Sequence, residues 1–178
     1  MITSVTKRIT FDVAHYLLNS KWSREKNIAT FHKCCLYKTD GSDMPHGHTY
    51  ILEVTVEGII DPETGYVIDF KQLKRILNEH VMEPLDHNLL NEVVPEFKSG
   101  AQLATAENIS YHIWDNIKDP IESVRPGEIW LQQIKLYETP NSFALLTKEM
   151  VEDKLIKSIE IDLESDCCDC IDSWKCEC

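Results

Sequence analysis

The chain has 178 residues, enough for one domain with a sizeable hydrophobic core. Its net charge of −12 argues against nucleic acid or an anionic membrane as a partner, since both require a basic surface, but it permits an anionic small substrate. No apolar stretch approaches the roughly 20 residues of a membrane span. The N-terminus lacks the basic-then-apolar form of a signal peptide, so we expect a cytoplasmic protein.

The first part of the chain predicts two strands joined by a long connection. Residues 5–15 alternate between apolar and polar side chains, which is typical of a half-buried strand. Residues 17–43 have no clear period and predict a loop of a length that is unusual without a function. Residues 49–58 alternate again and predict a second strand.

Three histidines fall on one predicted sheet face. His15 ends the apolar face of the first strand, and His46 and His48 continue the apolar face of Tyr50 backwards. If the two strands pair antiparallel, the end of the first lies beside the start of the second, and the three imidazoles converge. A three-histidine group with one open position is a common zinc site of enzymes.

Two helices are predicted in the middle of the chain. Residues 61–65 form a turn, and Val67 and Ile68 are extended. Asp69 can cap a helix with the apolar stripe Phe70, Leu73, Ile76, Leu77 and Val81, which ends before Pro84. Residues 85–91 predict a loop. Thr105 can cap a second helix with the stripe Ile109, Ile113 and Ile117, which ends before Pro120.

The last part predicts two further strands and an appendage. Residues 129–138 alternate, residues 143–146 begin a last strand, and a turn joins them. The order ββααββ predicts an α+β domain over residues 1–147. Residues 148–178 are acidic and then cysteine-rich, and we expect an extension to the domain. Its five cysteines could bind a second metal, but their spacing fits no zinc module, which favours a flexible or loosely packed tail.

Glu138 ends an otherwise apolar strand face, where a carboxylate is costly unless it has a partner. A structural salt bridge is one explanation, and a substrate contact is the other. In the same way, Asp86 and His87 could form a simple hydrogen bond within their loop or a proton relay.

Seven segments in this order resemble the 6-pyruvoyl-tetrahydropterin synthase and 6-carboxytetrahydropterin synthase family. The resemblance covers roughly residues 5–147 and is highly specific. The segments are Phe11-Asp12-Val13-Ala14-His15, Lys33-Cys34, His46-Gly47-His48-Thr49-Tyr50, residues 61–70, residues 84–91, Thr105-Ala106-Glu107-Asn108 and Tyr137-Glu138-Thr139-Pro140.

The resemblance implies a fold and an assembly. The family has the tunnelling fold (T-fold), a four-stranded antiparallel sheet with two helices on one face. It implies that trimers form barrels and that two trimers stack into a homohexamer, with sites at the subunit interfaces.

The resemblance also implies roles for individual residues. His15, His46 and His48 match the zinc ligands. Cys34 matches the catalytic cysteine, and Asp86 and His87 match the partners of its proton relay. The pterin-binding residues correspond to Thr105, Ala106, Glu107 and Glu138. Of these, Glu138 is expected to touch the pterin ring and not the metal.

The segment before His46 departs from the family pattern. It is longer than usual, so Cys34 has two competitors for the role of base: the adjacent Cys35, and Ser42 at the spacing of the shortest family form. A serine hydroxyl is a poor base at neutral pH, and Cys34 follows a lysine as the family cysteine does.

Three functions are compatible with the resemblance. The first is a zinc-dependent 6-carboxytetrahydropterin synthase that converts 7,8-dihydroneopterin triphosphate on the route to 7-deazaguanines and queuosine. The second is a 6-pyruvoyl-tetrahydropterin synthase of the biopterin route, which eliminates triphosphate. The third is a pterin-binding protein without catalysis. We favour the first because that activity is the more widespread one.

Overall fold

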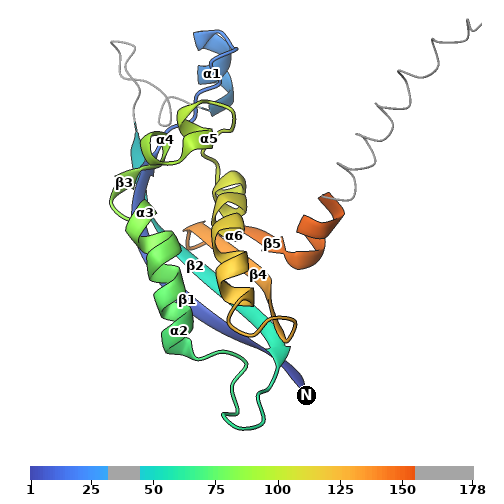
Figure 1. The fold of residues 1–178 in the computed structure, drawn as a ribbon. Helices are drawn as coiled ribbons and strands as arrows, with labels where there is room; N and C mark the ends of the chain where they lie inside the picture. The colour runs from blue at the N-terminus through green and yellow to red at the C-terminus, as the bar shows by residue number, and fades with distance from the viewer. Residues whose placement is uncertain (32–44, 155–178) are drawn as a thin grey trace, which may run out of the picture.

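The fold is built on a sheet of four long antiparallel strands (Figure 1). The computed structural model describes residues 1–31 and 45–154. The long strands lie in the spatial order β1 (Ile2–His15), β2 (His46–Ile59), β4 (Ile129–Thr139) and β5 (Ser142–Thr147). The α+β class and the four predicted strands are confirmed.

A fifth strand, absent from the sequence prediction, extends this sheet within the described residues. It is β3 (Asn88–Leu89), which pairs parallel with the end of β1. Two residues are too short to show the alternation that identifies a strand in a sequence. The strand lies in the predicted loop 85–91, and a short helix, α4 (Leu90–Val93), begins at the end of this loop.

Two helices cover one face of the sheet, as predicted. They are α2 (Phe70–Leu77), which Asp69 caps by accepting a hydrogen bond from the Lys71 N–H, and α6 (Ala106–Glu122). Figure 1 shows both in front of the strands. The core between the helices and the sheet includes the fully buried side chains Tyr50, Leu52, Leu73, Leu77, Ile109, Ile113 and Ile117.

Helical structure continues past both of the prolines that were predicted to follow the helices. The π-helical segment η2 (Asn78–Met82) follows α2, and α3 (Glu83–Leu85) continues through Pro84. A proline clashes with the carbonyl four residues earlier in a regular α-helix, and here that carbonyl lies in the wider π segment. Pro120 lies inside the last turn of α6.

The predicted loop 17–43 is partly helical. Helix α1 (Arg24–Phe31) lies within it, and the buried Asn27 organises its approach. The Asn27 side chain donates to the carbonyls of Asn19 and Ser23 and accepts from the Asn19 N–H. The apolar residues of α1 do not line up on one side of the helix, so the sequence shows no helical period there. A further short helix, α5 (Pro95–Lys98), precedes α6.

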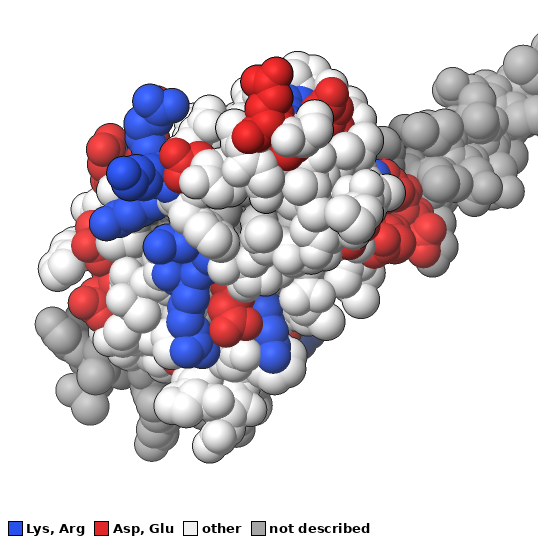
Figure 2. All heavy atoms as spheres, turned by 90° about the horizontal axis from the view of Figure 1, so that it is seen from below, with Lys and Arg blue, Asp and Glu red and all other residues white. Residues whose placement is uncertain are grey.

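The second face of the sheet is not covered by a helix among the described residues. Cross-strand polar pairs lie on it: Ser4 with Glu57, Thr6 with Thr55, and Arg8 with Glu53. Residues 148–154 continue from β5 as a helix, and Val151 packs against the core. On the end of the molecule seen in Figure 2, basic side chains are interspersed with acidic ones.

Candidate functional site

The end of β1 and the start of β2 bring three histidines together. The antiparallel register pairs His15 with His46 and Val13 with His48. The ring centroids lie 4.5 Å apart for His15 and His46, 5.4 Å for His15 and His48, and 4.8 Å for His46 and His48. The convergence predicted from alternation is therefore present in the structure.

The hydrogen bonds of this group leave ring nitrogens without partners. Nδ1 of His15 donates to the Ala104 carbonyl at 2.5 Å, and a neutral ring then carries its lone pair at Nε2. Nε2 of His15, Nδ1 of His46 and Nε2 of His48 are buried and have no hydrogen-bond partner among the described residues. Such unpartnered nitrogens are unusual in a folded protein and suit a metal ion.

Burial favours the neutral imidazoles that a metal requires. It lowers the pKa of His15, with smaller opposing effects from the Ala104 carbonyl and the Glu138 carboxylate. It also lowers the pKa of His46, and the two neighbouring histidines act in the same direction. Both rings can therefore bind a metal without first losing a proton at neutral pH.

Glu138, at the end of β4, joins the histidine group. Its Oε1 lies 3.5 Å from Nε2 of His15 and 3.6 Å from Nε2 of His48. One potential ligand atom from each of these three residues and from His46 lies within 4.8 Å of the others. The sequence predicts that Glu138 touches the pterin ring and not the metal, and the carboxylate lies beside the potential ligand atoms of the three histidines.

Tyr50 holds the Glu138 carboxylate through a hydrogen bond. It is fully buried, and its hydroxyl donates to Oε1 of Glu138 at 3.1 Å. Burial, followed by the charge and hydrogen bond of Glu138, raises the pKa of Tyr50, so the hydroxyl keeps its proton. In the sequence, Tyr50 marks a strand face and ends one of the segments that resemble the family, and neither signal predicts this hydrogen bond. The Ala104 carbonyl carries no signal in a sequence.

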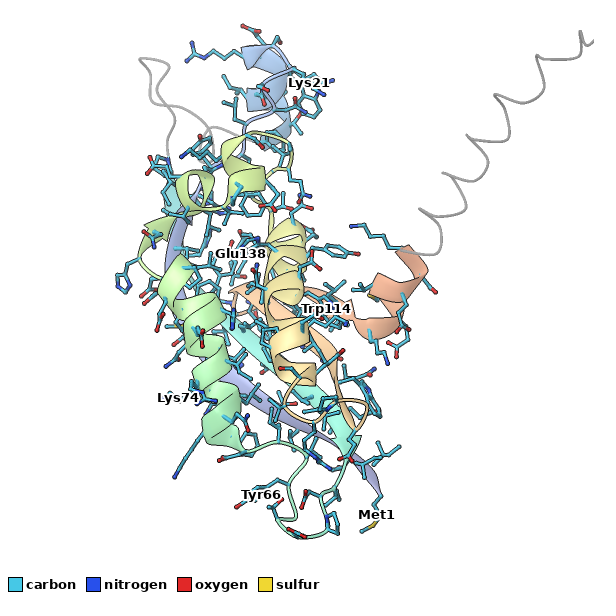
Figure 3. All side chains as sticks on the ribbon, viewed as in Figure 1. Met1, Lys21, Tyr66, Lys74, Trp114 and Glu138 are labelled. Carbon is cyan, nitrogen blue, oxygen red and sulfur yellow. The ribbon has the colours of Figure 1, made fainter. Side chains whose placement is uncertain are left out.

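The residues matched to the pterin pocket line one cavity. It has a volume of about 180 Å³, and its walls include His15, Thr105, Ala106, Glu107 and Glu138. Thr105 caps α6 by accepting from the Asn108 N–H, which places the start of this helix at the cavity. Figure 3 shows Glu138 beside the upper, N-terminal part of α6. The structure thus brings the four predicted pterin residues and one histidine together.

Asp86 and His87 form a second group, which is attached to β1 through Asp12. Oδ1 of Asp86 accepts from the Asp12 N–H at 2.8 Å, and the His87 N–H donates to the Asp12 carbonyl at 2.6 Å. Nδ1 of His87 lies 2.9 Å from Oδ2 of Asp86. The hydrogen bond from the Asp12 N–H is the main cause that lowers the pKa of Asp86, and the contact with His87 acts in the same direction with a smaller effect.

This second group is separate from the three histidines within the described part of the chain. The His87 side chain is 77% exposed, and its backbone has a φ of 58°, a conformation that few residues other than glycine adopt. His87 and Asp12 line a different, open concavity of about 420 Å³, together with His48. The remaining predicted residues, Cys34 with its competitors Cys35 and Ser42, lie outside the described residues, as do the tail cysteines.

Comparisons with known proteins agree with the resemblance. The family model described as 6-pyruvoyl tetrahydropterin synthase matches residues 4–149. The 6-pyruvoyl tetrahydrobiopterin synthase of Homo sapiens is 37% identical over 145 residues, which are 82% of this chain and 91% of that protein. The enzyme of the same name from Dictyostelium discoideum is 34% identical over 145 residues, 82% of this chain and 96% of that protein.

A solved structure extends the agreement to the fold. The 6-pyruvoyl tetrahydropterin synthase of Caenorhabditis elegans has a TM-score of 0.67 and 28% identity, and the match covers 83% of this chain and 96% of that one. Fold and site together define a T-fold protein with a buried histidine and glutamate group that could hold a metal. The chain belongs to the 6-pyruvoyl tetrahydropterin synthase family, whose members act on pterins. No helix among the described residues is long and apolar enough to cross a membrane.

Proposed function

We propose that this protein is a zinc-dependent 6-pyruvoyl-tetrahydropterin synthase that eliminates triphosphate from 7,8-dihydroneopterin triphosphate. The observation that carries the proposal is the cavity in which a potential metal ligand, His15, meets the carboxylate of Glu138. The names of the relatives support this reaction over the 6-carboxytetrahydropterin synthase that the sequence analysis favoured. The alternative given there is thus the better supported one.

Three histidines are proposed to hold the zinc ion. The unpartnered nitrogens of His15, His46 and His48 fit it, because zinc prefers neutral imidazole ligands. When bound, the ion supplies a Lewis acid that makes protons on adjacent substrate atoms easier to remove.

Glu138 is proposed to orient the pterin. A pterin presents a ring N–H and an amino group side by side, and a carboxylate can accept from both. Thr105, Ala106 and Glu107 form the neighbouring wall of the same cavity. Once the ring is fixed, the side chain of the substrate extends toward the histidine group.

The proton transfers are assigned to Cys34, Asp86 and His87. The Cys34 thiolate would take a proton from the substrate side chain, and Lys33 beside it in sequence would favour the thiolate. The hydrogen bond that Nδ1 of His87 donates to Asp86 orients the His87 ring, which can pass a proton on. Because His87 is exposed and separate from the histidine group, we propose that the relay meets the site of a neighbouring subunit in a homohexamer.

The test is incubation of the zinc-loaded protein with 7,8-dihydroneopterin triphosphate, followed by mass analysis of the product. Triphosphate release without carbon loss is the expected result. Release of acetaldehyde with a carboxylated pterin would instead identify the 6-carboxytetrahydropterin synthase reaction. Tight pterin binding without turnover would identify a binding protein.

A further inference from the structure

Two hydrogen-bond acceptors face each other in the histidine group. His15 donates its Nδ1 hydrogen to Ala104, so a neutral ring turns a lone pair at Nε2 toward Oε1 of Glu138, 3.5 Å away. His15 is only 2% exposed. A protonated ring would place a hydrogen in the gap, but a charge-assisted bond would be about 2.7–2.9 Å long. At 3.5 Å, the two atoms are not joined by a hydrogen bond.

The spacing of these atoms suits a shared cation. Neighbouring ligand atoms of a tetrahedral zinc site lie roughly 3.4 Å apart, given bonds of about 2.0–2.1 Å. The distances from Oε1 of Glu138 to Nε2 of His15 and of His48 are 3.5 and 3.6 Å. Both distances are close to this value, and the potential ligand atom of His46 lies within 4.8 Å of the same group, so the spacing suits a fourth ligand beside the three imidazoles.

We propose that Glu138 is the fourth metal ligand in the substrate-free protein, through Oε1, and that the pterin substrate displaces it. The hydroxyl of the fully buried Tyr50 holds Oε1 in this position at 3.1 Å. The part of the proposal in which Glu138 binds the metal requires only that the metal site exists. Displacement rests on the proposed function, in which the same carboxylate receives the pterin ring.

The surroundings of Glu138 allow both positions. Its side chain lies at the boundary between the histidine group and the cavity lined by Thr105, Ala106 and Glu107. It is 30% exposed, so the carboxylate has room to turn toward the cavity, and in doing so it gives up the hydrogen bond from Tyr50. Through this exchange, a coordination position on the metal would become free only when a correctly oriented pterin binds.

The first test measures Zn²⁺ affinity without substrate, by competition with a chelating indicator. Glu138→Gln should lower the affinity at least about tenfold, since even outer partners of metal ligands carry a 10–100-fold effect. Glu107→Gln is the matched control, because it removes a carboxylate from the same cavity at a position outside the ligand group; it should leave the affinity unchanged. Equal affinities of the native protein and Glu138→Gln would overturn the proposal.

The second test uses Co²⁺ in place of zinc and records its visible absorption. Glu138→Gln and Glu138→Ala should each change the spectrum of the substrate-free protein. Neopterin should change the spectrum of the native protein, because it releases the carboxylate. An identical spectrum for the native protein and both variants excludes Glu138 as a ligand, whatever the product assay shows. A protein that shows these metal effects but does not convert dihydroneopterin triphosphate would refute the function and retain the ligand.

Discussion

The Asp86–His87 pair is held by hydrogen bonds to Asp12 and not by the histidine group. Replacing Asp86 by Ala would free the His87 ring from its partner at 2.9 Å. We expect turnover to fall by about 10²–10⁴-fold, the usual contribution of a positioned acid or base. Metal binding by the histidine group should not change, because His15, His46, His48 and Glu138 form one group of potential ligands and Asp86 belongs to another. Steady-state kinetics and metal analysis of the same preparation test both statements, and loss of the metal would contradict the separation.

Cys34 is predicted to be the base, in preference to Cys35 and Ser42. Cys34→Ala should abolish turnover while metal and pterin still bind, because only the proton acceptor is removed. Cys35→Ala and Ser42→Ala are the matched controls and should stay active. An inactive Cys35→Ala protein would mean that the residue match is shifted by one position, and normal turnover of all three would refute a cysteine base.

At the residue scale, the sequence predicted what alternation along a strand can show. His15, His46 and His48 share a face because strand side chains repeat every two residues, and the register confirms it. The partners that orient this group were not predictable. The Ala104 carbonyl is a backbone group, and the Tyr50 hydroxyl contacts Glu138 across 88 residues of sequence.

At the scale of single elements, Gly58 controls the pairing of β2 with β4. A Cβ atom at this position would lie 2.7 Å from Cγ2 and 2.8 Å from Cα of Ile129, closer than real contacts allow. Gly58→Ala should therefore destabilise the protein by about 1–3 kcal/mol. Denaturant unfolding measures the loss. The proposed metal site at the opposite end of β2 should still bind zinc, and an unchanged unfolding midpoint would contradict the predicted clash.

The helices show why element ends are harder to predict than elements. The apolar spacing correctly identified α2 and α6, because a helix buries one stripe of its surface. Pro84 and Pro120 were predicted to follow these helices and lie within helical turns instead. A π turn that accommodates a proline depends on packing around it, and no local pattern reports that packing.

At the scale of the whole molecule, the uncovered sheet face predicts association. Leu145 in β5 is 42% exposed and lies opposite Lys135, on the sheet face that no helix covers within residues 1–31 and 45–154. We expect the native protein to sediment as a hexamer, with six times the 20.6 kDa chain mass. Leu145→Asp should shift it to smaller species because it buries a charge in the contact. Met150→Asp is the control, since Met150 is 49% exposed but lies beyond the sheet. A native monomer would refute the assembly.

The sequence predicted the architecture because its four long strands and two long helices each carry a clear period. It did not predict α1, which has 8 residues like α2 but no clear apolar stripe, nor β3, α4 and α5, which have 2, 4 and 4 residues. Elements of this size are stabilised by tertiary contacts, such as the hydrogen bonds of the Asn91 amide to both backbone groups of Tyr16. Periodicity alone cannot reveal such contacts.

The position of the histidine group at the meeting of three strands has a thermodynamic consequence. A metal held there would link the end of β1, the start of β2 and, through Glu138, the end of β4, acting as a reversible cross-link between distant parts of the chain. Because the unfolded chain lacks this arrangement, free metal at 100 times its Kd should stabilise the fold by about 2.7 kcal/mol. The melting temperature should rise with zinc concentration in the native protein. In His48→Ala the rise should be largely lost, and an equal rise would show that the ion binds elsewhere.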